Sequence, residues 1–314
     1  MKHRAAKLAD RALRAADTTV TAAAVIALLL LILIGGYAIW DAEQVYRAAS
    51  GKQYELYKPT DENSGKSFAE LQAINPEVFA WLTVYGTHID YPVAQGPDNI
   101  KYVNTNAEGN YSLTGAIFLD VGSRRDFSDF SSILYGHHME KNAMFGEIGS
   151  FVDRRFFEER RYGNLYFAGK EHGLEFFAFL HADAYDREVF RTGIRDAGSA
   201  EAYLALIRSR ALHTKDVPVT AQDRIVLLST CTADFTNGRD ILVGRITDEV
   251  YADTFKKKET GILRAVDTVK ALWERLPLRA KLVAAMLLLL LLTLAFYYIM
   301  RRIRKRDVNE NEGR

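Results

Sequence analysis

Two long apolar stretches near the ends of this 314-residue chain constrain most strongly what it can fold into. Residues 20–40, VTAAAVIALLLLILIGGYAIW, carry no charged side chain, and neither do residues 282–300, LVAAMLLLLLLTLAFYYIM. A helix needs about 20 apolar residues to cross the hydrocarbon core of a bilayer. Both stretches are long enough, so we predict an N-terminal and a C-terminal transmembrane helix around a folded middle region.

Each apolar stretch has an alternative interpretation. The first could be a secretory signal peptide, but its apolar run is long for one and no A-x-A-like cleavage site follows it. The second could be a buried core helix, but its leucine run has no polar face. Trp40, Tyr297 and Tyr298 lie near the span ends, where amphipathic rings favour the lipid–water boundary. We therefore favour two uncleaved anchors.

Basic residues flank both stretches on the side of the chain ends. They are Lys2, Arg4, Lys7, Arg11 and Arg14 before the first stretch and Arg301, Arg302, Arg304, Lys305 and Arg306 after the second. Clusters of Lys and Arg remain cytoplasmic, so we expect both termini inside and residues 41–281 outside the cell membrane. The formal net charge of +1 gives no indication of nucleic-acid binding.

The middle region is rich in short runs of β-branched and aromatic residues bounded by Gly, Asp or Asn, a pattern typical of strands. We expect strands at 88–93, 115–120, 131–137, 163–169, 174–185, 223–230 and 240–246. Helical patterns fall at 41–58, at 142–161 and at 199–213, where Ser199 is the expected N-cap, and also from 67 towards 84 with a break at Asn75-Pro76. This balance favours a mainly β fold: a largely antiparallel sheet closed into a barrel, with peripheral helices.

Cys231 is the only cysteine of the chain. Outside the cytosol a lone cysteine is either paired with another chain or reactive, although it can also be a small buried hydrophobe. A nucleophilic cysteine works as the thiolate and needs a base or a cation nearby. His137 follows a strand in YGHHM, and Arg239 opens the strand after Cys231.

The segment between Cys231 and Arg239 contains Asn237-Gly238, a turn signal, so two adjacent antiparallel strands should bring Cys231 beside Arg239. An arginine cannot act as a base, but it can donate to a carbonyl oxygen that becomes anionic during acyl transfer. Taken singly, Arg239 is more often a surface charge and His137 more often a strand-end histidine with satisfied hydrogen bonds, and only their combination with Cys231 favours a functional site. His137 and His138 are adjacent and would point to opposite faces of a strand, so we predict no metal site.

Three motifs resemble the sortases, the cysteine transpeptidases of Gram-positive cell surfaces. LLSTC (227–231) resembles the T-L-x-T-C signature, with Leu227 where the family usually has Thr; ILYGHHM resembles the Y-G-H segment, and GRDILVGRI the catalytic-arginine strand. Four further stretches resemble class B sortases in order and spacing, and the likeness covers residues 70–250. They are NPEVFAWLTVYGTHIDYPVAQGPDN, KYV, GAIFLD and NAMFGEI.

The resemblance implies a closed sortase-type β-barrel with its active site at one end and no cofactor. Cys231 would attack the Thr carbonyl of a C-terminal sorting signal on a surface protein, and class B members resemble enzymes that read N-P-x-T-x signals. An amine of a lipid-linked peptidoglycan precursor, or a pilin lysine, would resolve the thioester. His137 would be the general acid and base, and Arg239 would stabilise the substrate carbonyl and the oxyanion.

The same matching implies a substrate groove. Ser229 and Thr230 would line it, and Asn99 and Val103 match a DNxxYL-like stretch in DNIKYV, with Val103 in place of the usual Leu. His138 is the rival histidine, but the Y-G-H match selects His137. A second, C-terminal span is unusual for class B and resembles the pilin-polymerising class C, yet no Asp-Pro-aromatic lid segment precedes residue 70.

Together these expectations divide the chain into seven segments of a protein in the cell membrane of a Gram-positive bacterium. They are a cytoplasmic segment (1–19), a transmembrane helix (20–40), an extracytoplasmic stalk (41–69), a sortase catalytic domain (70–250), a juxtamembrane linker (251–281), a transmembrane helix (282–300) and a cytoplasmic basic tail (301–314). Two other functions remain open: a cysteine hydrolase (a thiol protease) that cleaves without joining, and a surface adaptor whose thiol is buried and lies far from His137 and Arg239.

Overall fold

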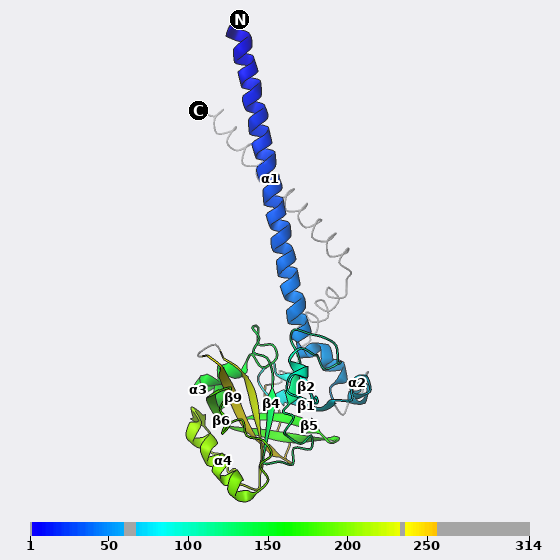
Figure 1. Ribbon diagram of the computed structural model, residues 1–314, viewed down its shortest axis with the longest axis vertical. Helices are drawn as coiled ribbons and strands as arrows, with labels where there is room; N and C mark the ends of the chain where they lie inside the picture. The colour runs from blue at the N-terminus through cyan, green and yellow to red at the C-terminus, as the bar shows by residue number, and fades with distance from the viewer. Residues whose placement is uncertain (1, 60–66, 233–235, 256–314) are drawn as a thin grey trace, which may run out of the picture. The chain divides into compact units, whose positions relative to one another are not determined.

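The computed structural model describes residues 2–59, 67–232 and 236–255 (Figure 1). The chain begins with one long helix, α1 (Lys2–Ala49), which contains the first predicted span. Within the described residues, one helical stretch, Ile26–Tyr46, is long and apolar enough to cross a membrane, and none of its most apolar window is buried. The second predicted span (282–300) and the basic tail lie outside the described residues.

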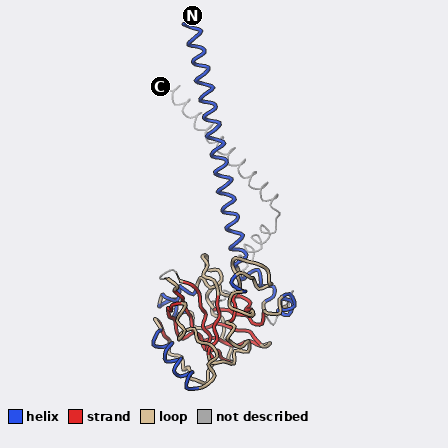
Figure 2. Tube along the Cα trace, viewed as in Figure 1, coloured by secondary structure: helices blue, strands red, loops and turns tan. Residues whose placement is uncertain are grey.

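Eight strands close into a barrel in the order β5-β1-β2-β3-β4-β8-β9-β6, because β6 also pairs with β5. Figure 2 shows the strands in red and the helices in blue. The strands are β1 (Val78–Val84), β2 (Asp90–Ala94), β3 (Ile117–Leu119), β4 (Ser131–Tyr135), β5 (Tyr162–Phe167), β6 (Lys170–Asp183), β8 (Arg224–Cys231) and β9 (Gly238–Thr247), and the short β7 (His213–Thr214) adds to β6. The β2–β3 and β4–β8 pairs are parallel and the others antiparallel. The predicted mainly antiparallel closed barrel is confirmed.

Strand β8 is buried on both faces, which explains its continuous apolar run. Val226 and Leu228 belong to the core cluster that all eight barrel strands share, which places them in the barrel interior. Ile225 and Leu227 lie in a second cluster with residues of helix α4 (Ala197–Arg210), which therefore covers the outer face of this part of the sheet. The strand is thus held rigidly up to its last residue.

The helix boundaries differ from the sequence predictions where side chains cap them. Asp196, not Ser199, is the N-cap of α4, and its carboxylate accepts a hydrogen bond from the Ser199 amide at 2.8 Å. The pattern at 142–161 is two short helices, a 3₁₀ helix η3 (Ile148–Val152) and α3 (Arg154–Glu159), because Asp153 ends the first and caps the second.

A strand replaces the C-terminal half of the predicted helical pattern from 67 towards 84. Helix α2 (Phe68–Ile74) stops before Asn75-Pro76, since a residue before proline disfavours the helical conformation. Strand β1 then begins at Val78 and is paired on both sides, with β2 and with β5. Pairing partners that are distant in sequence therefore override the local helical spacing.

Packing against the barrel extends on both sides of residues 70–250. After α1, the 3₁₀ helix η1 (Gly51–Tyr57) buries Tyr54 and Tyr57 in a cluster with residues of α2 and β1, so this part of the expected helical stalk packs against the folded domain. At the other end, the Tyr251 ring stacks on Tyr162 with centroids 4.1 Å apart. The folded region thus includes residues of the expected stalk (41–69) and of the expected juxtamembrane linker (251–281).

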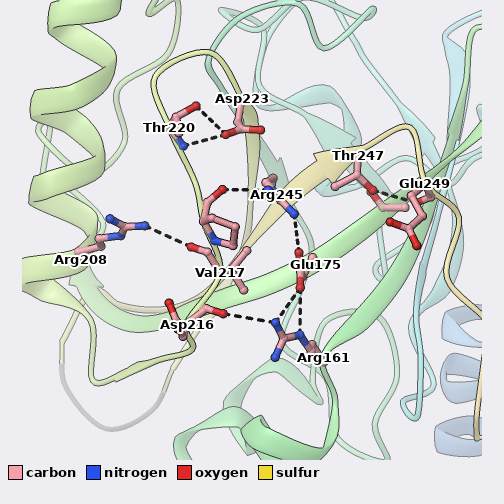
Figure 3. A network of polar contacts seen from close by, with 12 residues as sticks. Arg161, Glu175, Arg208, Asp216, Val217, Thr220, Asp223, Arg245, Thr247 and Glu249 are labelled. Carbon is pink, nitrogen blue, oxygen red and sulfur yellow. Dashed lines mark hydrogen bonds and ion pairs between the residues drawn. The ribbon is translucent and has the colours of Figure 1, made fainter.

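A polar network lies on the outer face of the sheet, near the start of β8 (Figure 3). The buried carboxylate of Glu175 accepts hydrogen bonds from Arg161 at 3.0 Å and from Arg245 at 2.7 Å. Arg245 also donates to the carbonyl of Pro218 at 2.9 Å, and Arg208 donates to that of Val217 at 3.3 Å. These bonds hold the extended segment before β8 against β6 and β9.

Candidate active site

The lone cysteine ends β8 and pairs directly with Arg239 near the start of β9. The chain reverses through Asn237, whose φ of 59° is the left-handed conformation that Asn tolerates in turns. The guanidinium Nη1 of Arg239 donates a hydrogen bond to Sγ of Cys231. The predicted adjacency is confirmed. Cys231 is exposed, so the interpretation of it as a buried core thiol is wrong.

His137 reaches the same end of the barrel because β4 runs parallel to β8. Tyr135, the last residue of β4, pairs with Ser229, and the Gly136 amide donates to the Ser229 carbonyl at 3.2 Å. The ring Nε2 of His137 lies 2.8 Å from the carbonyl oxygen of Val103. A carbonyl oxygen only accepts, so Nε2 carries a proton and Nδ1 is the ring atom left for proton transfer.

One cavity of about 330 Å³ gathers every residue that the sequence selected for the site. Those residues are Asn99, Val103, His137, Ser229, Thr230, Cys231 and Arg239, and the cavity is completed by Phe118, Tyr135, Gly136, Ala184 and Phe190. The rival histidine, His138, is exposed and instead forms a β-bridge with Met144. The cavity is therefore the candidate active site, and His137 is the histidine that lines it.

Sequence reasoning missed the buried Asp120, which orients two residues of the cavity. Its carboxylate accepts hydrogen bonds from the Tyr135 hydroxyl at 3.1 Å and from the Asn99 amide nitrogen at 2.8 Å. The Asn99 amide oxygen in turn accepts from the Val121 amide at 2.8 Å, so both ends of that side chain are fixed. Its position as the last residue of the predicted strand GAIFLD was the available signal.

Burial and the neighbouring Asp120 carboxylate raise the pKa of Tyr135 well above the usual range for tyrosine. The hydroxyl therefore remains protonated at every working pH and acts as a donor to Asp120. Its ring also forms an apolar wall of the cavity, with Phe118 at a centroid distance of 5.4 Å and Phe190 at 6.4 Å. The Tyr135 ring therefore presents an apolar surface to the cavity, and its hydroxyl is held by Asp120.

The hydroxyls of Ser229 and Thr230 are buried and have no hydrogen-bond partner among the described residues. The described part of the chain also contains no group of three or more His, Cys, Asp or Glu side chains placed to hold a metal ion. The side chains of Cys231, His137 and Arg239, which line the cavity, can support nucleophilic attack by sulfur, proton transfer at an imidazole and hydrogen bonding from a guanidinium.

Comparisons with known proteins identify the family to which the chain is similar. No family model matches the sequence. The chain is 30% identical over 179 residues to sortase B of Listeria monocytogenes, an overlap of 56% of this chain and 72% of the relative. Among solved structures, sortase B from the type II pilus of Streptococcus pneumoniae is 46% identical, covers 59% of this chain and all of its own, and gives a TM-score of 0.52.

A class B sortase of Streptococcus pyogenes involved in pilus biogenesis is 38% identical, with a TM-score of 0.53 over 57% of this chain and 97% of its own. The barrel and these likenesses define a sortase-type cysteine transpeptidase. More particularly, the chain belongs to the sortase B family. The resemblance seen in the motifs LLSTC, ILYGHHM and GRDILVGRI is confirmed.

Proposed function

We propose that this chain is a membrane-anchored sortase that cleaves a C-terminal sorting signal after Thr and transfers the protein to an amine. The observation that carries the proposal is the pairing of Cys231 with Arg239 at an exposed strand end, in the same cavity as His137. The family supplies the class of reaction, and these three residues supply the nucleophile, the acid–base group and the oxyanion donor.

In the first half-reaction, the Cys231 sulfur attacks the Thr carbonyl carbon as its thiol proton passes to His137. A carbon–sulfur bond forms, and the carbonyl oxygen becomes an anion that Arg239 stabilises by hydrogen bonding. A guanidinium has several donors in a fixed fork, so it can hold the sulfur and this oxygen together. The amide carbon–nitrogen bond then breaks, and the leaving amine takes the proton from His137.

In the second half-reaction, an incoming amine attacks the thioester and gives a proton to His137. The new carbon–nitrogen bond forms as the carbon–sulfur bond breaks, and the sulfur leaves with its electron pair and recovers the proton. The amine belongs to a pilin lysine or to a lipid-linked peptidoglycan precursor. Two relatives come from pilus systems, which supports a test of the pilin amine first.

We assign the substrate groove to Asn99, Val103, Ser229 and Thr230. Asn99 is supported by its fixed amide, which keeps one orientation beside the cavity. Ser229 and Thr230 are supported by their place in the lining of the cavity beside Cys231. The Val103 carbonyl contacts His137, so a peptide beside Val103 would lie next to the acid–base group.

We also propose that α1 is an anchor in the cell membrane of a Gram-positive bacterium, with both termini cytoplasmic and residues 41–281 outside. The exposed apolar stretch Ile26–Tyr46 supports one span, and the uncharged residues 282–300 support a second. The catalytic domain (70–250) would then work at the membrane surface. Anchoring raises the effective concentration of enzyme relative to membrane-bound partners.

The test uses the full-length chain in lipid nanodiscs with a fluorogenic N-P-x-T-x peptide and two amines, a pilin-type lysine peptide and a peptidoglycan cross-bridge peptide. We expect an acyl-enzyme mass on Cys231 and a product joined to one of the amines. Cys231→Ala should lose all turnover while its thermal unfolding stays unchanged, and retained turnover would refute the assignment. Release of only the free acid with either amine would identify a hydrolase.

A further inference from the structure

The end of the anchor helix and the loop that carries His137 meet at a single buried hydroxyl. The histidine loop, residues 136–146, runs from the end of β4 towards η3. The Tyr91 hydroxyl, on β2, donates to the carbonyl of Ala49, the last residue of α1, at 2.9 Å. The same hydroxyl accepts a hydrogen bond from the Met144 amide at 2.9 Å. Tyr91 is only 2% exposed, so both hydrogen bonds are buried.

Met144 is close to His137 through contacts of the residues next to each of them. It forms a β-bridge with His138, and the next amide, that of Phe145, donates to the His137 carbonyl at 3.0 Å. Phe145 itself is fully buried in the barrel core. The backbone of His137 is therefore held by Phe145, and the Tyr91 hydroxyl hydrogen-bonds the preceding residue, Met144.

The histidine loop adopts a conformation that needs outside support. Lys141, Asn142 and Met144 have φ values of 54°, 59° and 52°, in the left-handed region that is uncommon for residues other than glycine. Such conformations persist where surrounding contacts determine them, and they concentrate at functional sites. The bond from Tyr91 is made at Met144, one of these three residues.

The surface of α1 contacts the same loop. The Tyr46 hydroxyl donates to the Glu140 carboxylate at 3.0 Å, and Lys141 lies 3.4 Å from Glu43 and 4.0 Å from the Tyr46 ring centroid. Exposed contacts of this kind are individually weak. These contacts nevertheless link the end of α1 to Glu140 and Lys141 at the tip of the histidine loop. The Tyr91 hydroxyl links the same helix end to Met144 at the base of the loop.

We propose that Tyr91 is a positioning residue that couples the end of the anchor helix to the histidine loop and so to the placement of His137. The proposal rests on the acid–base role proposed above for His137. A helix end that is held in the membrane would then keep the histidine loop in its left-handed backbone conformation. Small displacements of a catalytic group reduce turnover strongly, and more so than substrate binding.

Tyr91→Phe in the full-length chain in nanodiscs tests this coupling, because it removes the hydroxyl and keeps the ring. Its matched control is Tyr54→Phe, since Tyr54 is also buried and its hydroxyl hydrogen-bonds the backbone at Ala107, away from the loop. We expect Tyr91→Phe to lower kcat for the fluorogenic peptide roughly tenfold with little change in KM. Tyr54→Phe should leave both constants close to wild type.

Amide hydrogen exchange provides a readout that does not depend on activity. In Tyr91→Phe the amides of Met144 and Phe145 should exchange faster than in wild type, while those of β8 should not. If the wild type forms no acyl-enzyme, the proposed function fails, but the exchange result still tests the coupling. Equal effects of the two Tyr→Phe variants on kcat, or unchanged exchange at Met144, would overturn the proposal.

A surface variant covers the case in which Tyr91→Phe does not fold. Tyr46→Phe combined with Lys141→Ala removes the contacts between α1 and the loop tip without touching a buried group. We expect faster exchange across 136–146 and a fall in kcat of about twofold, in line with the small energies of exposed contacts. Wild-type exchange and wild-type kcat in this variant would also overturn the coupling.

Discussion

The two ends of β9 each carry an arginine, and the two arginines have different partners. Arg239 and Arg245 lie on the same face of the strand, because an even number of positions separates them. Arg245 is bound to the buried Glu175 and to the Pro218 carbonyl (Figure 3). Arg239 contacts the exposed Cys231, and among the described residues no carboxylate lies within ion-pair distance of it. An arginine whose buried carboxylate partner holds it is structural, whereas one without such a partner can serve a substrate.

The largest expected effect is a loss of activity when Arg239 is replaced. Arg239→Ala removes the proposed oxyanion donor and should lower kcat/KM by about 10²–10³-fold with little change in thermal stability. Arg239→Lys keeps the charge but loses the fork and should recover only a small part. Steady-state kinetics with the fluorogenic peptide measures both. Near wild-type turnover in Arg239→Ala would show that the comparison assigns the wrong role.

The opposite pattern is expected at the other end of the strand. Glu175→Ala leaves Arg161 and Arg245 without their buried partner and should lower the free energy of unfolding by about 3 kcal/mol. The folded fraction should keep its kcat, since Cys231 and His137 are at the far end of the barrel. Urea denaturation with parallel kinetics checks this. A loss of kcat without a loss of stability would contradict the division between the two ends.

A smaller effect is expected at Asp120, which belongs to the active-site end but does not line the cavity. Asp120→Asn keeps the size of the side chain but removes the charged acceptor for the Tyr135 hydroxyl and the Asn99 amide. We expect KM to rise about tenfold, equivalent to roughly 1–2 kcal/mol for a hydrogen bond to a charged group. Tyr135→Phe, measured alongside, should show a smaller rise, because it removes only one of these bonds.

The smallest expected effect is a pH dependence at the structural end. Burial lowers the pKa of Lys215 to about 8, and its ammonium donates to the Arg160 carbonyl at 3.2 Å. The folded state thus binds fewer protons than the unfolded state above this pKa, so stability should rise between pH 8 and the usual lysine pKa of about 10.4. Lys215→Met should abolish that rise and add about 1 kcal/mol at pH 7, after allowing for partial solvent screening. Denaturation midpoints across this pH range measure both effects.

The parts of the molecule that local sequence determines were predictable. The turn signal at Asn237 and the apolar runs on either side of it predicted the antiparallel pair that joins Cys231 to Arg239. The position of His137 followed from a motif at the end of a strand. In each case neighbouring residues carry the information, or a family signature preserves it.

Contacts between distant residues were not predictable. Asp120 and Tyr91 act through hydrogen bonds to residues far away in the chain, and neither has a residue pattern that indicates its partner. Ser199 is of a residue type that often caps helices, but Asp196 directly precedes the first residue of α4 and is the N-cap. The apolar residues of β1 have a helical spacing, so the local sequence did not predict this strand. Its stability comes from pairing with β2 and β5 rather than from its own residues.

The parallel pairing of β4 with β8 has a consequence for the order in which the protein is made. The His137 strand precedes the Cys231 strand by β5, β6 and α4, so their contact has a high sequence separation and can form only after β8 has been synthesised. Synthesis proceeds from the N-terminus, and domains fold as the chain emerges. A nascent chain therefore possesses the imidazole well before the sulfur, and an unfinished molecule has no means of capturing a substrate.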